Sequence, residues 1–253
     1  MQSFWLKSFR PPFKYLFVFA HMRSGSTLLT HILNSNPEIV GYGETKVEYL
    51  KHDSLNNLLK KNAEFFGKNR LSETFVMDKI VHDELFVDLS ILKRPDVHCI
   101  FLLREPGRSV SSITKMYREI LPNLLNGFVG GETDALEYYR RRLDKMSHLA
   151  EATENSQHCY FITFDQLIEK TEIVFAELKN FLEVQHEFSE TYDLHRGTGV
   201  PGTGDYSQSI KQGKIIREKD GALESLAPEI IELALAYYDT ASTRLKAACR
   251  HLD

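Results

Sequence analysis

The chain has 253 residues, of which 42% are hydrophobic and 26% charged, a balance typical of a folded soluble protein. Its 31 basic and 35 acidic residues give a net charge of −4, so the chain lacks the overall positive charge of proteins that bind nucleic acid broadly. An anionic ligand would therefore need a local cationic pocket.

The three cysteines, Cys99, Cys159 and Cys249, are far apart in the sequence. Their odd number and spacing fit neither a disulfide framework nor a zinc motif, which favours a reducing, cytoplasmic location and predicts no metal site. The early apolar run at residues 15–20 is far shorter than the roughly 20 residues that a membrane span needs. We therefore expect neither a signal peptide nor a membrane span.

The first predicted strand, Tyr15–Ala20, leads into a short polar loop and then a helical pattern at Thr27–Asn34. The loop reads Arg23-Ser24-Gly25-Ser26-Thr27. The N–H groups and the dipole of a helix N-terminus attract anions, and Gly25 lets a ligand approach the backbone closely. This segment predicts an anion-binding turn with Arg23 as a fixed positive charge. An ordinary capped turn between a strand and a helix has the same pattern.

The rest of the chain alternates apolar runs with helical patterns. Three further strands are predicted at Phe75–Met77, Val97–Leu103 and Tyr160–Phe164. Helices are predicted over residues 47–66, 83–92, 107–119, 135–153 and 172–181, and residues 221–250 form C-terminal helices. This alternation predicts an α/β fold with a central parallel sheet and helices on both faces, which we expect to span residues 1–253 as one domain.

The C-terminal helical part has an apolar pattern of its own. Its apolar positions have helical spacing and are predicted to pack in the core: Ile230, Ile231, Leu233, Leu235 and Tyr238.

Charged side chains follow the predicted strands, where the ligands of parallel sheets bind. Lys79 comes after the second strand, Arg104 after the third and Asp165 after the fourth. Cations thus follow three of the four strands, namely Arg23, Lys79 and Arg104, and predict a crevice for a multiply charged anion. Arg104 and Ser112 lie eight residues apart across a strand-to-helix turn and could grip one phosphate between them.

Four glycines within residues 197–204 mark a long irregular segment at about residues 195–214. Long loops of this kind are typical of functional lids, although a plain linker has the same composition. We expect a mobile lid, because Lys211, Lys214 and Arg217 lie within it or just beyond it and could close over an anion.

The two motifs together resemble those of sulfotransferases that use 3′-phosphoadenosine 5′-phosphosulfate (PAPS). In that family an [RK]-S-G-[ST]-T loop binds the 5′-phosphosulfate, and a later Arg with a Ser eight residues on binds the 3′-phosphate. The resemblance implies a P-loop-like, sulfotransferase-type sheet and binding of PAPS, or its product PAP, without a metal. It also implies which residues bind the cofactor: Arg23, Ser24, Gly25, Ser26, Thr27, Leu28, Arg104, Ser112 and Phe164.

The chain is most similar to the branch that includes tyrosylprotein and bacterial carbohydrate sulfotransferases. That branch has Arg in the first loop and a Gly-Glu pair about twenty residues later, here Gly43-Glu44. The resemblance implies that Glu44 is the general base and that Arg23 and Lys79 stabilise the sulfuryl group. It leaves the roles of His82 and Arg108 open. Phe164 stands where a Tyr often packs on adenine.

The sequence thus predicts an enzyme that transfers a sulfuryl group from PAPS to a hydroxyl of a sugar, lipid or small metabolite. We expect an acceptor cleft lined by Phe65, Phe66, Tyr117 and Tyr138. Two alternatives stay open. A P-loop kinase of a small molecule shares the sheet, but the G-K-[ST] of its phosphate loop is missing here. A non-catalytic module of the same fold could sense the nucleotide or scaffold partners.

Overall fold

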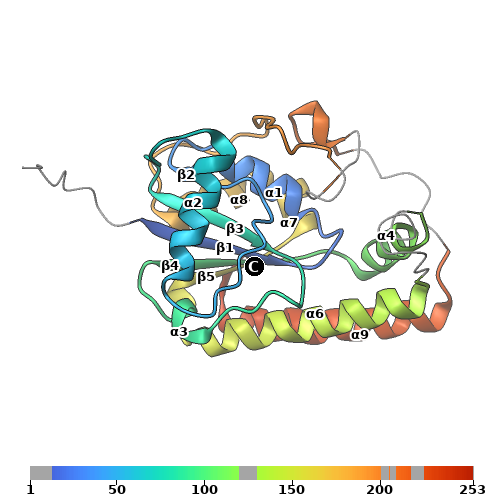
Figure 1. The fold of residues 1–253 in the computed structure, drawn as a ribbon. Coiled ribbons are helices and arrows are strands. Elements are labelled where there is room, and N and C mark those ends of the chain that lie inside the picture. The colour runs from blue at the N-terminus through green and yellow to red at the C-terminus, as the bar shows by residue number, and fades with distance from the viewer. Residues whose placement is uncertain (1–12, 120–129, 201–204, 206–208, 218–224, 253) are drawn as a thin grey trace, which may run out of the picture.

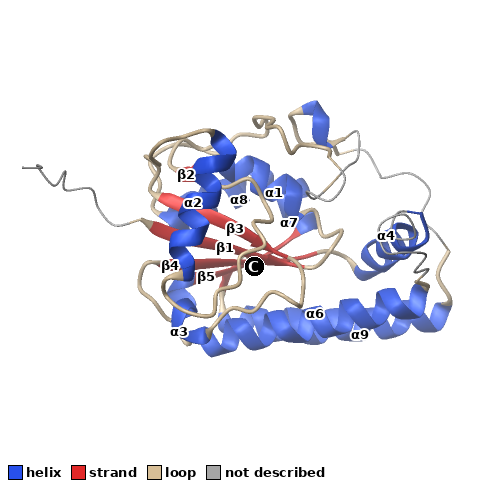
Figure 2. Ribbon diagram, in the orientation of Figure 1, coloured by secondary structure: helices blue, strands red, loops and turns tan. Residues whose placement is uncertain are grey.

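A parallel β-sheet runs through the middle of the protein (Figures 1 and 2). The structure is a computed structural model that describes residues 13–119, 130–200, 205, 209–217 and 225–252. In this part of the chain six strands form one sheet in the order β2-β3-β1-β4-β5-β6, and every neighbouring pair is parallel. The strands are β1 (Lys14–Ala20), β2 (Ile39–Val40), β3 (Phe75–Ile80), β4 (Val97–Leu103), β5 (Cys159–Thr163) and β6 (Arg250–His251).

Helices cover both faces of the sheet, which confirms the predicted α/β fold. One face packs against α2 (Ser54–Phe66), α3 (Leu89–Leu92), α4 (Pro106–Glu119), α6 (Glu132–Thr153) and α9 (Pro228–Ala248). The other packs against α1 (Ser26–Asn34), α7 (Phe164–Glu169) and α8 (Thr171–Leu182). Two short 3₁₀ turns, Ser156–His158 and Ile210–Gln212, complete the described elements. Among these described helices, none combines the length and the apolar character needed to cross a membrane.

The central strand β1 shows why its sequence is an unbroken apolar run. Phe17 and Phe19 belong to the core beneath α6 and α9, whereas Leu16, Val18 and Ala20 belong to the core beneath α1 and α8. Successive side chains of a strand point to opposite faces, so a strand buried on both faces has no polar alternation.

Two predicted strand ends differ from the structure. β3 continues to Ile80, so Asp78 and Lys79 lie inside the strand and not after it. Phe164 is the first residue of α7, where the Thr163 hydroxyl caps the helix by accepting the Gln166 N–H at 3.2 Å. The two-residue strands β2 and β6 were not predicted, because such short pieces have no periodicity.

Two predicted helices begin later than their sequence patterns indicate. α2 starts at Ser54 and α3 at Leu89. The residues before them pair with each other: the Tyr49 N–H donates to the Phe86 carbonyl and the Asp88 N–H to the Tyr49 carbonyl, each at 2.8 Å. These long-range hydrogen bonds satisfy the backbone in an extended bridge and replace the local bonds of a helix.

The predicted core face of α9 is correct only in part, since Ile230 and Tyr238 are partly buried and pack against the core. Ile231, Leu233 and Leu235 are exposed, and the fully buried positions are Ala234, Ala241 and Leu245. In the described residues the C-terminal segment holds one long helix, which lies along α6 (Figure 1).

Candidate functional site

The turn between β1 and α1 has the conformation of an anion-binding loop. Arg23 and Gly25 both have positive φ angles, 62° and 85°, and Gly25 begins α1 without a side-chain cap. The first turn of α1 contains no acidic residue. The Ser24 hydroxyl is buried and has no hydrogen-bond partner among the described residues. First-turn N–H groups and an uncommitted hydroxyl are the donors that an anion would bind.

The Thr27 hydroxyl is arranged as a further donor. Its oxygen accepts hydrogen bonds from Lys79 Nζ and from the Asp205 N–H, each at 3.0 Å. A hydroxyl has one donor and two acceptor positions. Since both acceptor positions are used, the hydroxyl proton is left to point at a third group. The Thr27 hydroxyl therefore keeps one donor position in the first turn of α1.

The two sequence motifs meet at the carboxyl ends of β1 and β4. Arg23 Nε donates to the Ser112 hydroxyl at 2.9 Å, and an Arg104 guanidinium nitrogen donates to the Arg23 carbonyl at 3.2 Å. Arg23 also pairs with the Asp205 carboxylate at 3.3 Å. The structure thus brings together Arg23, Arg104 and Ser112, as predicted, and adds Asp205, which no sequence signal indicated.

Phe164 forms one wall of this site. The guanidinium carbon of Arg104 lies 4.5 Å from the centroid of its ring. A Cβ atom added to Gly25 would lie 2.2 Å from the same ring. The ring therefore limits how close residue 25 can come, and only glycine fits between Phe164 and the anion-binding turn. Leu28 is partly buried and packs its side chain against the core beneath α1.

We expect Gly25→Ala to lower the free energy of unfolding by about 2–5 kcal/mol. A left-handed backbone conformation costs a non-glycine residue about 1–2 kcal/mol, and overpacking against Phe164 adds about 1–3 kcal/mol. Gly67→Ala is the matched control, because Gly67 also has a positive φ, 63°, but its added Cβ would meet nothing within 4 Å. Urea unfolding of both variants measures the difference, and equal losses would contradict the close contact with Phe164.

Glu44 lies between two basic side chains. Its two oxygens are each 3.1 Å from a nitrogen, one from Lys79 Nζ and the other from His82 Nε2. Burial acts to raise the pKa of Glu44, but the charge of Lys79 and the hydrogen bond from His82 outweigh it and lower the pKa to about 2. Glu44 is therefore ionised at neutral pH. His82, whose role the sequence left open, is a direct partner of this carboxylate.

Asp78 supports the loop that carries Glu44. Its carboxylate accepts the Thr45 N–H at 2.9 Å, the Thr45 hydroxyl at 2.7 Å and the Tyr49 hydroxyl at 2.6 Å. The Lys79 N–H also donates to the Gly43 carbonyl, at 3.1 Å. Burial is the main cause that raises the pKa of Asp78, to about 6. These bonds fix Glu44 beside Lys79.

Arg142 on α6 is fully buried at the same end of the sheet. Its guanidinium donates to the Ala20 carbonyl at 2.8 Å and to the Ile80 carbonyl, and it lies 3.5 Å from the Asp83 carboxylate. It thereby satisfies the last carbonyl groups of β1 and β3. In the sequence Arg142 follows two other arginines, so nothing distinguishes it from a surface charge.

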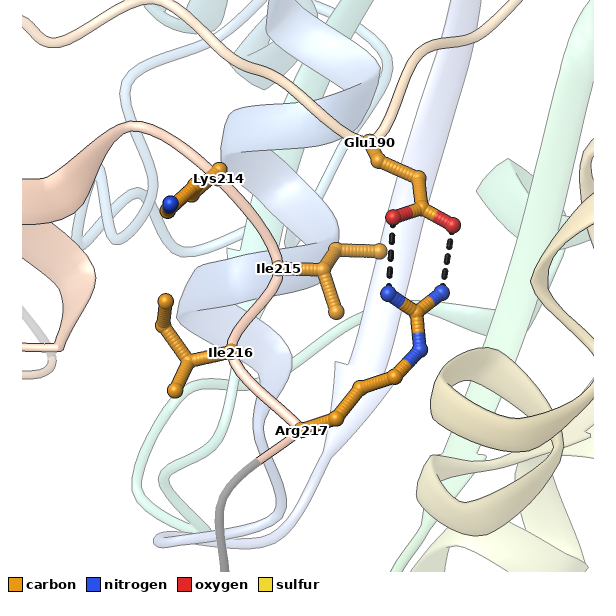
Figure 3. A pocket seen from close by; sticks show the side chains of 5 residues that line it. All are labelled: Glu190, Lys214, Ile215, Ile216 and Arg217. Carbon is orange, nitrogen blue, oxygen red and sulfur yellow. Dashed lines mark hydrogen bonds and ion pairs between the residues drawn. The ribbon is translucent and has the colours of Figure 1, made fainter.

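Two other predicted contributors have structural partners instead. Arg217 makes a double ion pair with Glu190, one of whose bonds measures 2.8 Å, and Lys214 points away from that pair (Figure 3). The Tyr138 hydroxyl accepts the Met22 N–H at 2.8 Å and donates to the Val81 carbonyl at 2.7 Å. Tyr138 therefore joins the loops after β1 and β3, and its place in an acceptor cleft stays a prediction. Among the described residues, no three His, Cys, Asp or Glu side chains are grouped as metal ligands.

Comparisons with known proteins identify the fold. No family model matches the chain, and no curated protein matches its sequence. Among solved structures, a sulfotransferase domain from the curacin biosynthetic pathway has a TM-score of 0.60 at 16% identity, covering 90% of this chain and 98% of that one.

Two further solved structures are similar over most of their length. The sulfotransferase domain of the Synechococcus PCC 7002 olefin synthase has a TM-score of 0.52 at 19% identity, covering 92% of this chain and 98% of that one. A sulfotransferase from Alicyclobacillus acidocaldarius has a TM-score of 0.53 at 12% identity, covering 92% and 94%. The chain therefore has the fold of the sulfotransferases.

Proposed function

We propose that this chain is an enzyme that transfers a sulfuryl group from PAPS to an acceptor hydroxyl. The observation that carries the proposal is the continuous contact from Glu44 through Lys79 to Thr27, which joins an ionised carboxylate to an anion-binding turn. The shared fold of three solved sulfotransferases supports it. The proposal treats residues 1–253 as one cytoplasmic domain.

The residues of the anion-binding turn fit the cofactor. The backbone and hydroxyls of residues 24–28 would hold the 5′-phosphosulfate, since the buried Ser24 hydroxyl and the oriented Thr27 hydroxyl are matched to an anion. Arg104 and Ser112 would hold the 3′-phosphate, and Phe164 would stack on adenine. When bound, PAPS supplies the activated sulfuryl group. Arg23 and Lys79 provide positive charge where negative charge develops.

Glu44 is the residue that we assign to receive the proton of the acceptor hydroxyl. Its carboxylate is ionised at neutral pH and is therefore ready to accept a proton. A carboxylate of such low pKa is a weak base, so its neighbour matters. His82 Nε2 lies 3.1 Å from the second Glu44 oxygen, and its N–H would hold the carboxylate in place while the first oxygen faces Lys79. The acceptor class that we propose is a sugar, a lipid or a small metabolite, by resemblance to the carbohydrate branch.

The first test is calorimetric titration with PAP, in parallel with ATP and magnesium. We expect micromolar binding of PAP without metal and weak binding of ATP. A preference for ATP with magnesium would favour the kinase alternative and remove the roles given to Arg104 and Ser112. Binding of PAP without turnover of PAPS on any hydroxyl acceptor in a broad panel would favour the non-catalytic module.

The role of Arg104 is tested by Arg104→Ala. We expect PAP to bind about 10–100-fold more weakly, the loss of a charge-assisted hydrogen bond. Adenosine 5′-phosphosulfate lacks the 3′-phosphate, so its affinity should change little. Arg141→Ala, at an exposed position of α6, is the control. Equal losses for both nucleotides would show that Arg104 does not act through the 3′-phosphate.

A further inference from the structure

His31, one turn into α1, has a defined protonation pattern. Nδ1 lies 2.8 Å from the Thr27 carbonyl oxygen, and Nε2 lies 2.8 Å from the Thr198 hydroxyl. A carbonyl oxygen only accepts, so Nδ1 carries the proton and Nε2 accepts the proton of Thr198. The imidazole is buried, and burial is the main cause that lowers its pKa. His31 is thus a neutral ring that uses both nitrogens.

Thr198 joins this ring to the glycine-rich segment. Its hydroxyl oxygen accepts a hydrogen bond from the His195 N–H at 2.9 Å, and the hydroxyl donates a hydrogen bond to His31 Nε2. The His195 ring stacks on His31 with centroids 4.5 Å apart and an angle of 18° between the planes. The Tyr192 and His31 rings form an edge-to-face pair with centroids 5.5 Å apart. Residues 195–198 are therefore attached to α1 by hydrogen bonds and by ring stacking.

The same segment also reaches the loop of Glu44. The guanidinium carbon of Arg196 lies 4.3 Å from the centroid of Phe65, and Tyr42 stacks on Phe65 at 4.0 Å with an angle of 12°. Two groups this close cannot share one face, so they cover opposite faces of the Phe65 ring. Tyr42 lies two residues before Glu44 in the chain. Residues 195–198 therefore contact α1 on one side and Phe65 of α2 on the other, and Phe65 in turn packs on Tyr42 of the Glu44 loop.

We propose that His31 and Thr198 are positioning residues, which hold residues 195–198 against the first turn of α1 and so keep Thr27 in its ligand-binding orientation. The link acts through Thr27. Its carbonyl oxygen accepts a hydrogen bond from His31 Nδ1, and its hydroxyl oxygen accepts hydrogen bonds from Lys79 Nζ and the Asp205 N–H. Neither residue touches the reacting atoms in this assignment. The inference rests on the proposed function where it takes PAP as the ligand.

Thr198→Val tests the link, because it removes the hydroxyl and keeps the shape. We expect PAP to bind about tenfold more weakly, the loss of roughly one hydrogen bond. Thr198→Ser restores the hydroxyl and should return the affinity to within about twofold of the wild type. Thr191→Val is the control, since Thr191 is an exposed residue whose hydroxyl bonds only to Ser189 among the described side chains. Unchanged binding in Thr198→Val would overturn the proposal.

His31→Asn tests the same link from its other end. The Asn amide can replace Nδ1–H as the donor to the Thr27 carbonyl, but it leaves Thr198 without its acceptor. We expect His31→Asn to weaken PAP binding by about tenfold, and the double variant with Thr198→Val to be no weaker than either single variant. Independent effects that multiply to about a hundredfold would overturn the link. Unfolding midpoints show whether each variant is folded.

A second readout does not depend on the cofactor. Nitrogen-15 spectra of the labelled imidazoles should show a protonated Nδ1 and a hydrogen-bonded Nε2 for His31. The His21 ring has the same pattern, with Nδ1 against the Met22 carbonyl and Nε2 accepting the Arg104 N–H, so His31→Asn identifies the His31 signals by their loss. Thr198→Val should shift that Nε2 signal, and Thr191→Val should not. A His31 ring protonated on Nε2 would overturn the proposal. If the wild type does not bind PAP but these shifts appear, the proposed function fails and the link stands.

Discussion

Replacing Glu44 by Gln should lower the rate of sulfuryl transfer by about 10²–10⁴-fold, the usual contribution of a general base. Gln keeps the shape and one acceptor oxygen for Lys79 but cannot receive the proton of the acceptor. The proposed nucleotide site, at Thr27, lies on the other side of Lys79 from Glu44. Affinity for PAP should therefore change by no more than about threefold, which is less than the loss of one hydrogen bond would cause. Steady-state rates with PAPS and calorimetry with PAP measure the two effects.

Glu48→Gln is the matched control, because Glu48 is an exposed carboxylate on the same loop. It should leave both the rate and the affinity unchanged. A large loss of PAP affinity in Glu44→Gln would show that Glu44 mainly holds Lys79 in place. A larger loss of rate in His82→Ala than in Glu44→Gln would assign the proton transfer to His82.

The stability of the same variant depends on pH with a defined sign. The pKa of Glu44 in the folded chain is lowered to about 2 from an ordinary value of 4.5. A lowered pKa contributes stability that is fully present above the ordinary value and is lost as the pH falls toward 2. Urea unfolding should therefore show Glu44→Gln less stable than the wild type at pH 7, and this difference should shrink below about pH 4.

The second large effect is expected from Arg142→Met, which should lower the free energy of unfolding by about 3–5 kcal/mol. Met fills much of the volume but donates no hydrogen bond. The variant leaves the carbonyls of Ala20 and Ile80 and the carboxylate of Asp83 without their buried partner. Unsatisfied buried groups carry their full desolvation penalty. Denaturant unfolding at neutral pH measures the loss.

The neighbouring Arg141 supplies the control for this experiment. Its side chain is 57% exposed, so Arg141→Met should change the free energy of unfolding by no more than about 0.5 kcal/mol. Some buried ion pairs can be replaced by apolar side chains without loss. If Arg142→Met is as stable as the wild type, the ion pair of Arg142 is one of those that can be replaced. Water or a shifted backbone would then supply hydrogen bonds to the Ala20 and Ile80 carbonyls.

The parts of the fold that the sequence predicts correctly are those with local or periodic signals. The four long strands are apolar runs because both faces of the sheet are covered, and the anion-binding turn is a contiguous motif. Arg104 and Ser112 come together because one strand-to-helix turn fixes their separation. Their meeting with Arg23 follows from the neighbouring positions of β1 and β4 in the sheet.

The features that escaped prediction depend on contacts between distant segments. Lys79 interrupts an apolar strand, so its burial becomes understandable only once Glu44 is seen beside it. The partnership of His82 with Glu44, and of His31 with Thr198, joins residues 38 and 167 positions apart. Ile231, Leu233 and Leu235 of α9 were mistaken for core because their apolar spacing does not show that Ala234, Ala241 and Leu245 are the buried positions.

The adjacent charges on β3 also help the sheet to choose one alignment. Asp78 and Lys79 point to opposite faces, the acid toward Thr45 and Tyr49 and the base toward Thr27. A slip of this strand by one residue would exchange the two faces. It would place a carboxylate against the anion-binding turn and bury an ammonium against two hydroxyls. Misaligned pairings of β3 are thus penalised electrostatically, so two residues that serve the site also make the sheet fold in a single register.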